Sequence, residues 1–475
     1  MKNYTKCKFA QKFFWLIPFA LVVILGLALP SPKPALAQSA GLPEYVVQPG
    51  DTLYDIAIQF NTSIDAIMVA NGFTDSDILS IGEHVKIPGM EGISGLLVTE
   101  YVPLGATLTN LSRQSQTPIS TLVKLNKLIS PSELLLGSPL VMFAAEDTTK
   151  MTVMPALSDG ESLMEASLLT GQNPWGVAKL NSLADPNTAL PADAFYMPSQ
   201  NDSNGEMSLP GVDSITIDHL PLAQGSTYTF KVLSAQPVQI KANLAGEQST
   251  FVNLGNGEQI AFGGIKALLD PGIYPLQLVI TTQNGKTYNF EQYVLVASGN
   301  FITDQTLNVD PSTLEDENTK KEDAEFLDLV SQVTPFQLWT GKFQYPVAEP
   351  ICIRSYFGSR RTYNNDPRIF YHTGLDLGYC GGIDVFAPAK GTVMAVRPNQ
   401  IVRGNAIVID HGLGIFTTYM HLSDISVKEG DVVKPGQLIG HIGSTGRSIG
   451  PHLHFQVDVN GTPVDPQEWL SVQFP

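Results

Sequence analysis

The chain has 475 residues, which is too long for one hydrophobic core, so several domains are expected. Its formal net charge of −17 argues against nucleic acid as a partner, because phosphate binding requires clustered Lys and Arg. With 43% hydrophobic and 15% charged residues, the composition is that of an ordinary globular protein. We therefore expect a folded, multidomain protein.

Residues 1–37 have the layout of a secretory signal peptide. Four lysines in the first twelve residues precede an apolar run from Phe13 to Leu29, and Ala35 and Ala37 form a small-residue cleavage site. Because the apolar run is long for a signal, an uncleaved N-terminal anchor is the alternative, and only then is membrane contact expected. The rest of the chain is expected outside the cytoplasm, secreted or associated with the cell envelope, since it has no second apolar stretch of spanning length.

A repeat of 55 residues occurs three times after this segment. Gly50, Gly105 and Gly160 are evenly spaced, and each is followed 21 residues later by an asparagine. Each unit is predicted to fold as strand, helix, helix and strand. In the first unit, 45–47 and 85–87 have strand patterns, and two amphipathic helices lie between them.

The first unit, residues 44–89, resembles the LysM module, a small βααβ domain that in its family binds N-acetylglucosamine-containing glycans such as peptidoglycan. The resemblance implies that glycan contacts lie in two loops, at Asp51, Thr52, Asp77 and Ile78. Residues 97–144 and 151–199 are predicted to be degenerate LysM-like units, because Asp51 is replaced by Ala106 and by Glu161 in them. For these later copies a spacer role and a glycan-binding role are both open.

Residues 211–298 change to a β pattern. Tyr228, Phe230 and Val232 alternate with polar neighbours, and Asn284–Gly285 has the form of a hairpin turn between two alternating runs. A β-sandwich-like module is predicted. It shows no chemical motif, so an architectural role is expected.

Residues 304–335 are predicted to form an acidic helical linker. Ser312 to Glu315 has the form of a capping box, and acidic residues crowd the first helical turn. Phe326, Leu327 and Val330 are predicted to pack this helix onto a neighbour. The sequence allows the helix either to cover an adjacent site or only to connect domains.

Two cysteines lie outside the N-terminal segment, Cys352 and Cys380. In an exported domain two cysteines are permitted to form a disulfide. Buried free thiols are the alternative, because the sequence does not establish whether the geometry of a disulfide is reached.

Six of the eight histidines lie after residue 371, and neutral imidazole is both a zinc ligand and a proton carrier. Residues alternate as in a strand between Pro451 and Val459, so His452 and His454 are predicted to share one face. Asp376 follows His372 by four residues. Together these clusters can supply two nitrogens and one oxygen to a tetrahedral zinc ion whose fourth position stays open to water.

Within the predicted domain 340–475, residues 343–468 resemble the lysostaphin/LytM-type zinc metallopeptidases, the murein endopeptidase family with the duplicated hybrid motif. Besides the histidine clusters, the matching segments are residues 355–360, 387–393 and 443–451. The resemblance implies a compact all-β antiparallel domain. The predicted fold is therefore multidomain, with three small α+β units, a β-sandwich-like module and this peptidase domain.

The resemblance also implies roles for the histidine clusters. The implied zinc ligands are His372, Asp376 and His454, with one zinc ion per chain. His452 is expected to act as general base, and His421 to stabilise the oxyanion or protonate the leaving amine, although these two roles could be exchanged. His411 and His441 are expected to be noncatalytic.

The predicted function is that of an exported zinc metalloendopeptidase that hydrolyses peptide bonds in bacterial peptidoglycan. The LysM unit would tether it to the wall and raise the local substrate concentration. The alternative is a noncatalytic LytM-type scaffold that activates other cell-wall hydrolases. Such scaffolds have lost metal ligands, whereas all three ligands and both catalytic histidines are present in this sequence.

Overall fold

The computed structural model describes residues 41–475 except 75–78, 91, 131–132, 145–150, 155–156, 158–159, 182, 190–194 and 199–206. The expected signal or anchor, residues 1–37, lies outside the described residues, as do the expected glycan contacts Asp77 and Ile78. Within the part that is described, no helix combines the length and the apolar character that crossing a membrane requires. Leu42–Pro475 forms one compact unit.

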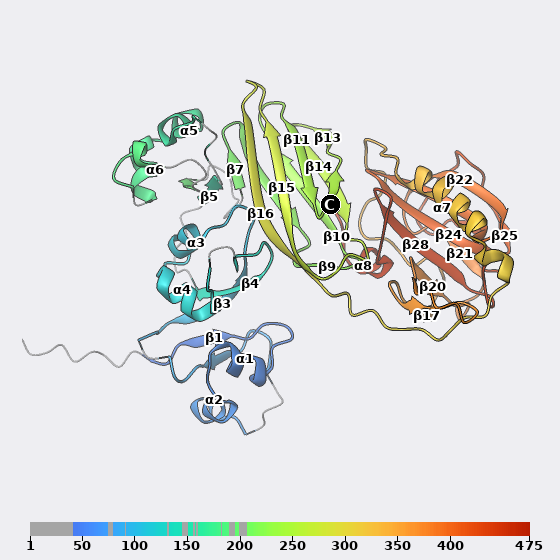
Figure 1. Ribbon diagram of the computed structural model, residues 1–475, viewed down its shortest axis with the longest axis horizontal. Helices are drawn as coiled ribbons and strands as arrows, with labels where there is room; N and C mark the ends of the chain where they lie inside the picture. Colours follow the sequence, from blue (N-terminus) through green and yellow to red (C-terminus); the bar gives the residue numbers. More distant parts are fainter. Residues whose placement is uncertain are drawn as a thin grey trace, which may run out of the picture. The chain divides into compact units, whose positions relative to one another are not determined.

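The first two βααβ units share a four-stranded sheet (Figure 1). The first unit consists of β1 (Glu44–Val46), α1 (Leu53–Gln59), α2 (Ile64–Asn71) and β2 (His84–Lys86). The second consists of β3 (Leu96–Tyr101), α3 (Leu108–Gln114), α4 (Ile119–Asn126) and β4 (Pro139–Phe143). The predicted order of elements is confirmed in both. The parallel pairing of β1 with β3, which joins the two units, was not predicted.

A repeated asparagine ties the second helix of each unit to its last strand. Each of the three side chains donates to a backbone carbonyl oxygen in that strand and accepts the N–H of the same residue. The pairs are Asn71 with Lys86, Asn126 with Val141, and Asn181 with Tyr196. The repeated asparagine therefore reflects one structural requirement, the closure of each unit onto a strand residue 15 positions later.

The third unit joins the β module that follows it. Its elements are β5 (Met151–Met154), α5 (Leu163–Leu169), α6 (Pro174–Leu180), η2 (Pro186–Thr188) and β6 (Phe195–Pro198). The strands β5 and β6 form one edge of a seven-stranded sheet of order β13-β14-β10-β8-β7-β5-β6. The other strands of this sheet are β7 (Met207–Leu209), β8 (Val212–Asp218), β10 (Thr227–Leu233), β13 (Val252–Gly255) and β14 (Glu258–Gly264).

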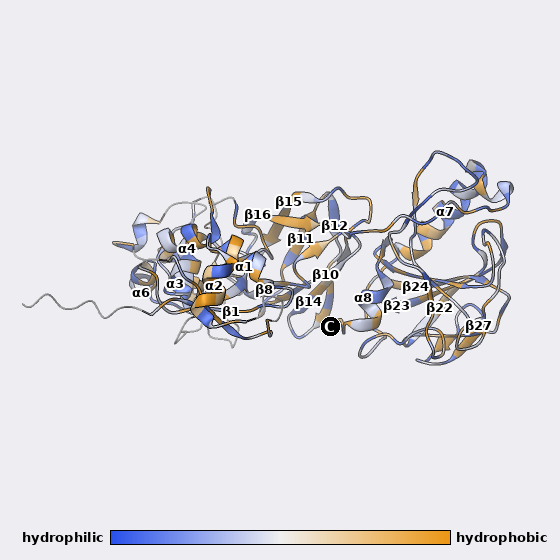
Figure 2. Cartoon of the chain, turned by 90° about the horizontal axis from the view of Figure 1, so that it is seen from below, coloured by the Kyte–Doolittle hydropathy of each residue, from blue (hydrophilic) through white to orange (hydrophobic). Residues whose placement is uncertain are grey.

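A second sheet packs against this one across a hydrophobic core. Its order is β12 (Glu247–Ser249), β11 (Gln239–Leu244), β15 (Gly272–Thr281), β16 (Thr287–Ala297) and β9 (Leu222–Ala223). Phe230 and Val232 of the first sheet share a core with Leu276 and Leu278 of the second. Orange, hydrophobic segments run along β11 and β15 in Figure 2. These contacts give the module the sandwich form expected from its alternating strands.

The C-terminal domain is built on an eight-stranded sheet. Its strands, in spatial order, are β17 (Ile353–Ser355), β20 (Leu375–Leu377), β28 (Leu453–Val459), β24 (Ile415–Leu422), β23 (Gly404–Gly412), β22 (Gly391–Gln400) and β26 (Val432–Val433), and β29 (Thr462–Val464) pairs with β28. Two smaller sheets contain β18 (Arg360–Arg361) with β19 (Phe370–Tyr371), and β21 (Asp384–Phe386), β27 (Leu438–His441) and β25 (Asp424–Ile425). These pairs are antiparallel, as expected. A short helix, α8 (Pro466–Ser471), ends the chain and was not predicted.

The acidic segment before this domain forms η3 (Pro311–Leu314) and α7 (Asp316–Val330). The predicted capping box is wrong, because Asp310 caps η3 by accepting the backbone N–H and the hydroxyl of Ser312. Phe326 and Val330 pack α7 onto the main sheet as predicted, whereas Leu327 is 51% exposed. Figure 1 shows α7, in yellow, across the strands β22 and β24.

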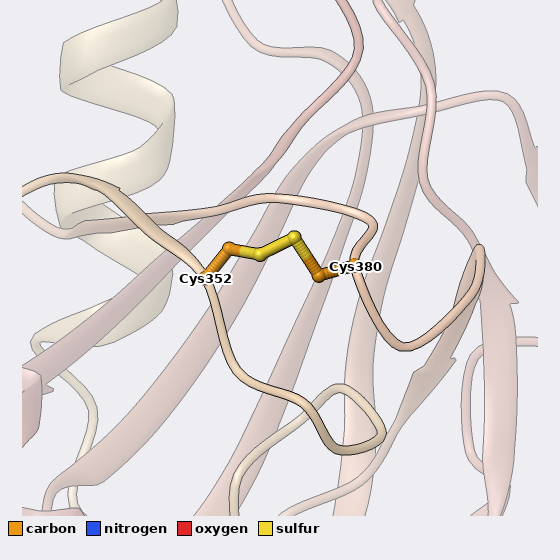
Figure 3. Close-up of a disulfide and its surroundings, with 2 residues drawn as sticks. All are labelled: Cys352 and Cys380. Carbon is orange, nitrogen blue, oxygen red and sulfur yellow. A yellow bond between two sulfur atoms is a disulfide. The ribbon is translucent and has the colours of Figure 1, made fainter.

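A disulfide joins Cys352, before β17, to Cys380, after β20 (Figure 3). The two cysteines are separated by 28 residues. The closed loop contains His372 and Asp376, so the disulfide constrains the segment that carries two of the expected zinc ligands.

The sandwich and the C-terminal domain share part of one hydrophobic core. Phe262 of β14 contacts the rings of Trp339, Trp469 and Phe474. The indole Nε1 of Trp469 donates to the hydroxyl of Thr227 in β10 at 3.0 Å. The two modules are therefore joined by buried contacts as well as by the connecting chain.

Candidate metal centre and active site

Two neighbouring strands bring the expected zinc ligands together. In the antiparallel pair of β20 with β28, Asp376 lies directly opposite His454. Directly opposed residues on one face of a sheet have Cβ atoms only about 5 Å apart. His372 lies just after β19 and is four residues before Asp376, so its ring reaches the same place.

The three ligand atoms form a compact triangle. His372 Nε2 lies 2.9 Å from Asp376 Oδ1 and 2.9 Å from His454 Nδ1. His454 Nδ1 lies 3.1 Å from the same carboxylate oxygen. A tetrahedral zinc ion with bonds of about 2.0–2.1 Å places its ligands roughly 3.3 Å apart, so the observed triangle needs little expansion to hold one.

The outer nitrogens of His372 and His454 form hydrogen bonds that leave the lone pairs of the inner nitrogens facing the triangle. His372 Nδ1 donates to the carbonyl oxygen of Tyr356 at 2.9 Å, and His454 Nε2 lies 3.3 Å from Oε1 of Gln456. Burial lowers the pKa of His454 to about 4. Burial alone raises the pKa of Asp376, but His372 and His454 lower it well below its ordinary range. A carboxylate facing two imidazole lone pairs is a donor set that fits a divalent cation such as zinc.

Two further imidazoles lie beside the triangle. His452 Nε2 is 3.6 Å from Asp376 Oδ1, and the ring of His421 is centred 5.0 Å from that of His452. Each ring donates from Nδ1 to a backbone carbonyl oxygen at 2.8 Å, that of Gly450 for His452 and that of Thr445 for His421. The Nε2 atom of each neutral ring is therefore the one that can accept a proton.

His421 has an unusual backbone and an unusual environment. Its φ is 65°, in the left-handed region that residues with a β-carbon rarely adopt. Burial lowers its pKa to about 3, with further lowering by His452 and His454. The imidazole is therefore neutral at physiological pH.

A cleft of about 900 Å³ is lined by these histidines and by the elements around them. Its size is in the range of sites that bind small molecules or short peptides. Residues of α7 line it, as do four arginines at positions 354, 361, 403 and 447. Arg361 donates to Asp304 at 3.0 Å, and its Nη1 lies 3.8 Å from Oδ2 of Asp376. The candidate metal centre therefore lies in a cleft lined by charged side chains of both signs.

Gln456, Asp458 and Arg361 support the site but were missed in the sequence. A signal for two of them was present, because the polar alternation of His452 and His454 continues through Gln456 and Asp458 on the same strand. No comparable pattern marks Arg361, whose contacts join segments far apart in the chain.

His411 and His441 lie away from the cleft. His411 is fully buried and bonds the Lys390 carbonyl oxygen at 2.9 Å and the Thr417 hydroxyl at 2.8 Å. His441 bonds a carboxylate oxygen of Asp424 at 2.8 Å. These contacts give both histidines local structural roles, which supports the expectation that neither is catalytic.

In the first βααβ unit, Asp51 and Thr52 form internal hydrogen bonds. The carboxylate of Asp51 accepts the Tyr45 hydroxyl and the Gln48 backbone N–H, both at 2.8 Å. The Thr52 hydroxyl caps α1 by accepting the Asp55 N–H at 3.1 Å. Both residues therefore shape the loop, and their glycan contacts stay a prediction.

The model of peptidase family M23 matches residues 370–466, which contain the three expected zinc ligands and both expected catalytic histidines. The chain contains a peptidase M23 domain. The LysM domain model matches residues 45–88 and 104–143. Both resemblances seen in the sequence are thus confirmed, and the assignment of 151–199 to the same family stays a prediction.

Relatives of the M23 domain have names that describe peptidases. Peptidoglycan DD-endopeptidase ShyA of Vibrio cholerae is 42% identical over 122 residues, or 26% of this chain and 28% of the relative. DD-carboxypeptidase/endopeptidase Mpg of Neisseria meningitidis is 45% identical over 104 residues, or 22% of this chain and 23% of the relative. The matches thus span less than a third of either relative.

Among solved structures, the antimicrobial peptidase lysostaphin from Staphylococcus simulans is 41% identical where it matches. The match covers 21% of this chain and 43% of lysostaphin, with a TM-score of 0.20.

Proposed function

We propose that the chain is an exported zinc metalloendopeptidase that hydrolyses peptide bonds in bacterial peptidoglycan and is held at the wall by LysM. The observation that carries the proposal is the buried triangle of two imidazole nitrogens and one carboxylate oxygen, with two more imidazoles beside it. The name of the relative ShyA, a peptidoglycan DD-endopeptidase, supports peptidoglycan as the substrate class.

One zinc ion per chain would be held by His372 Nε2, His454 Nδ1 and the carboxylate of Asp376. Zinc bound by such a set lowers the pKa of a coordinated water and polarises the scissile carbonyl. The chain contributes the orientation of these ligands. Tyr356 and Gln456 fix the outer nitrogens of the two rings, so the inner nitrogens stay free of protons.

His452 is the better placed of the two remaining histidines to act as general base. Its Nε2 accepts the proton of the attacking water, and the imidazolium so formed lies 3.6 Å from the carboxylate of Asp376. The Gly450 carbonyl oxygen holds Nδ1–H during this transfer, so the ring keeps its orientation.

His421 faces the same cleft with a depressed pKa. A neutral ring with its Nδ1–H on Thr445 carries no proton on Nε2, so any proton that His421 passes to the oxyanion or the leaving amine is one that it has first accepted from the attacking water. The two histidines thus carry the protons released by the water to the leaving amine.

Export and tethering are supported by features outside the cleft. The disulfide between Cys352 and Cys380 is typical of proteins in oxidising compartments outside the cytoplasm. The LysM domain at 45–88 would bind the N-acetylglucosamine-containing glycan and hold the M23 domain near its peptide substrate, and the LysM domain at 104–143 would act as a second binding unit or as a spacer.

The test is to incubate the chain from residue 38 onward with peptidoglycan, with and without a chelator, and to identify soluble fragments by mass. We expect chelator-sensitive release of fragments with new amino and carboxyl ends, which also identifies the bond. Asp376→Ala should lose both zinc and hydrolysis, whereas His441→Ala should keep both. Hydrolysis by the Asp376→Ala variant would contradict the ligand assignment. A wild-type chain that binds zinc but releases nothing would favour the noncatalytic scaffold.

A further inference from the structure

Helix α7 brings a buried carboxylate to the backbone turn that follows β22. Glu322 is 8% exposed, and its Oε1 accepts the N–H of Ile401 at 2.6 Å and that of Val402 at 3.1 Å. Its Oε2 accepts the N–H of Val402 at 3.1 Å and that of Arg403 at 3.2 Å. Three consecutive N–H groups converging on one carboxylate form an anion-binding backbone arrangement. Glu322 of α7 thus binds the backbone of the turn at residues 401–403.

The rest of α7 is anchored on either side of this carboxylate. Arg403 donates from Nη2 to Asp323 at 2.7 Å, and its guanidinium lies 4.6 Å from the centre of the Phe326 ring. At the end of the helix, Val330 is buried in a cluster with Ala395. The acidic helix is therefore fixed to the M23 domain by charge, stacking and apolar packing.

Two backbone carbonyl groups hold His421. One belongs to the turn at 401–403, and the other belongs to a loop that packs against the residue after this turn. The carbonyl oxygen of Arg403 accepts the His421 backbone N–H at 3.0 Å. Gly404 packs so tightly on the neighbouring loop that a Cβ on Gly446 would lie 2.4 Å from its nitrogen. Next to Gly446 is Thr445, whose carbonyl oxygen accepts Nδ1–H of His421.

These contacts matter because they hold His421 in an unfavourable backbone conformation. Its φ of 65° is unfavourable for a residue with a β-carbon, and such a conformation persists only where its surroundings hold it. We infer that Glu322 is a positioning residue for His421, acting through the turn at 401–403. The inference rests on the proposed function, in which His421 takes part in hydrolysis. It makes α7 a part of the active site, although the sequence presents it as a linker.

A competing role for α7 makes the opposite prediction. Thr319, Asp323 and Phe326 line the cleft, so the helix could instead obstruct substrate. If α7 were an inhibitory lid, weakening its attachment would raise activity. If Glu322 positions His421, weakening the attachment lowers activity.

The deciding variant is Glu322→Gln in the full exported chain. A glutamine has the same shape but offers one acceptor, and it turns an NH₂ group toward N–H donors. We expect kcat to fall on the order of 10-fold to 100-fold, with KM and the zinc content little changed. Glu322→Asp keeps the charge and should be intermediate. Glu325→Gln, an exposed position on the same helix, makes the same charge change and should match wild type.

Amide hydrogen exchange gives a second readout that does not need hydrolysis. We expect faster exchange at His421 and at residues 401–403 in Glu322→Gln than in wild type or Glu325→Gln. Unchanged exchange at His421, or a rise in kcat, would overturn the inference. If the wild-type chain fails to cleave peptidoglycan, the proposed function fails, and the exchange result still decides whether Glu322 holds His421.

Discussion

The side-chain amide of Gln456 donates to both carboxylate oxygens of Asp458, at 2.8 and 3.0 Å. This fixes the amide so that its oxygen faces His454 Nε2 at 3.3 Å and accepts the Thr373 hydroxyl at 2.7 Å. Asp458 is fully buried, so solvent does not compete for these bonds. The carboxylate thus sets which nitrogen of His454 faces His372 and Asp376.

Replacing Asp458 with Ala is expected to weaken zinc binding. The amide of Gln456 would lose its anchor, and His454 would lose the partner that fixes its tautomer. Loss of such an outer partner typically reduces metal affinity by about 10-fold to 100-fold. Competition with a chromophoric chelator measures the change, with Asp424→Ala, an exposed carboxylate, as the matched control. Equal zinc affinity in both variants would show that the chain from Asp458 to His454 has no influence on the metal.

His452→Ala and His421→Ala are expected to keep zinc and lose activity. Neither ring belongs to the ligand triangle, and each has a proton-accepting Nε2 in the cleft. Removal of a general acid or base typically lowers kcat by about 10²-fold to 10⁴-fold. Metal analysis and rates on one peptidoglycan preparation measure both properties, and His441→Ala serves as control. Loss of zinc in either variant would move that histidine into the metal centre.

Removing the disulfide is expected to destabilise the M23 domain. Cys352 and Cys380 close a loop of 28 residues, and a loop of this length contributes about 3 to 4 kcal/mol by restricting the unfolded chain. Denaturant unfolding of the doubly substituted Cys352→Ser, Cys380→Ser chain, followed by fluorescence of the buried tryptophans, measures the loss. The wild type in reducing buffer should behave like the variant. An unchanged midpoint would mean that the loop is held as well without the covalent bond.

The burial of Glu468 is expected to make stability depend on pH. The carboxylate accepts the Thr227 N–H at 2.8 Å, and burial raises the pKa of Glu468 from 4.5 to about 7. Because the folded-state pKa exceeds the unfolded one, the neutral carboxyl of Glu468 contributes stability that is fully present below about pH 4.5 and is lost as pH rises through about 7.

Comparison with Glu468→Gln isolates this effect. Asp465, whose pKa burial also raises, is present in both proteins and cancels in the difference. The Tm of wild type relative to the variant should fall between about pH 5 and about pH 8. Parallel Tm curves over this range would show that Glu468 does not change its protonation within it.

The sequence predicts that His372, Asp376 and His454 lie together, as they do in the structure, because its signals are local. His372 and Asp376 lie four residues apart, His452 and His454 alternate on one strand, and the family pattern orders the clusters. The sequence also predicts the strand-helix-helix-strand units, because amphipathic helices and short strands have periodic patterns of apolar residues.

What the sequence does not predict consists of contacts between distant segments. The pairing of β1 with β3 and the attachment of Glu322 to residues 401–403 have no local period. Glu322 is one of several acids on a charged helix, and only its burial distinguishes it. Gln456 and Asp458, by contrast, continue the polar alternation of His452 and His454 along one strand, so the sequence does contain a signal for them.

Phe262 packs against the indole rings of Trp339 and Trp469. This contact limits how the M23 domain can be separated from the sandwich, both in truncated proteins and during evolution. An M23 domain cut free at residue 340 would lose both Phe262 and Trp339, so the rings of Trp469 and Phe474 would form an uncovered face and the fragment would tend to self-associate. Calorimetry should accordingly show the sandwich and the M23 domain melting as one cooperative unit. Any recombination that moved this M23 domain to a new partner would have to carry the sandwich with it or replace that face.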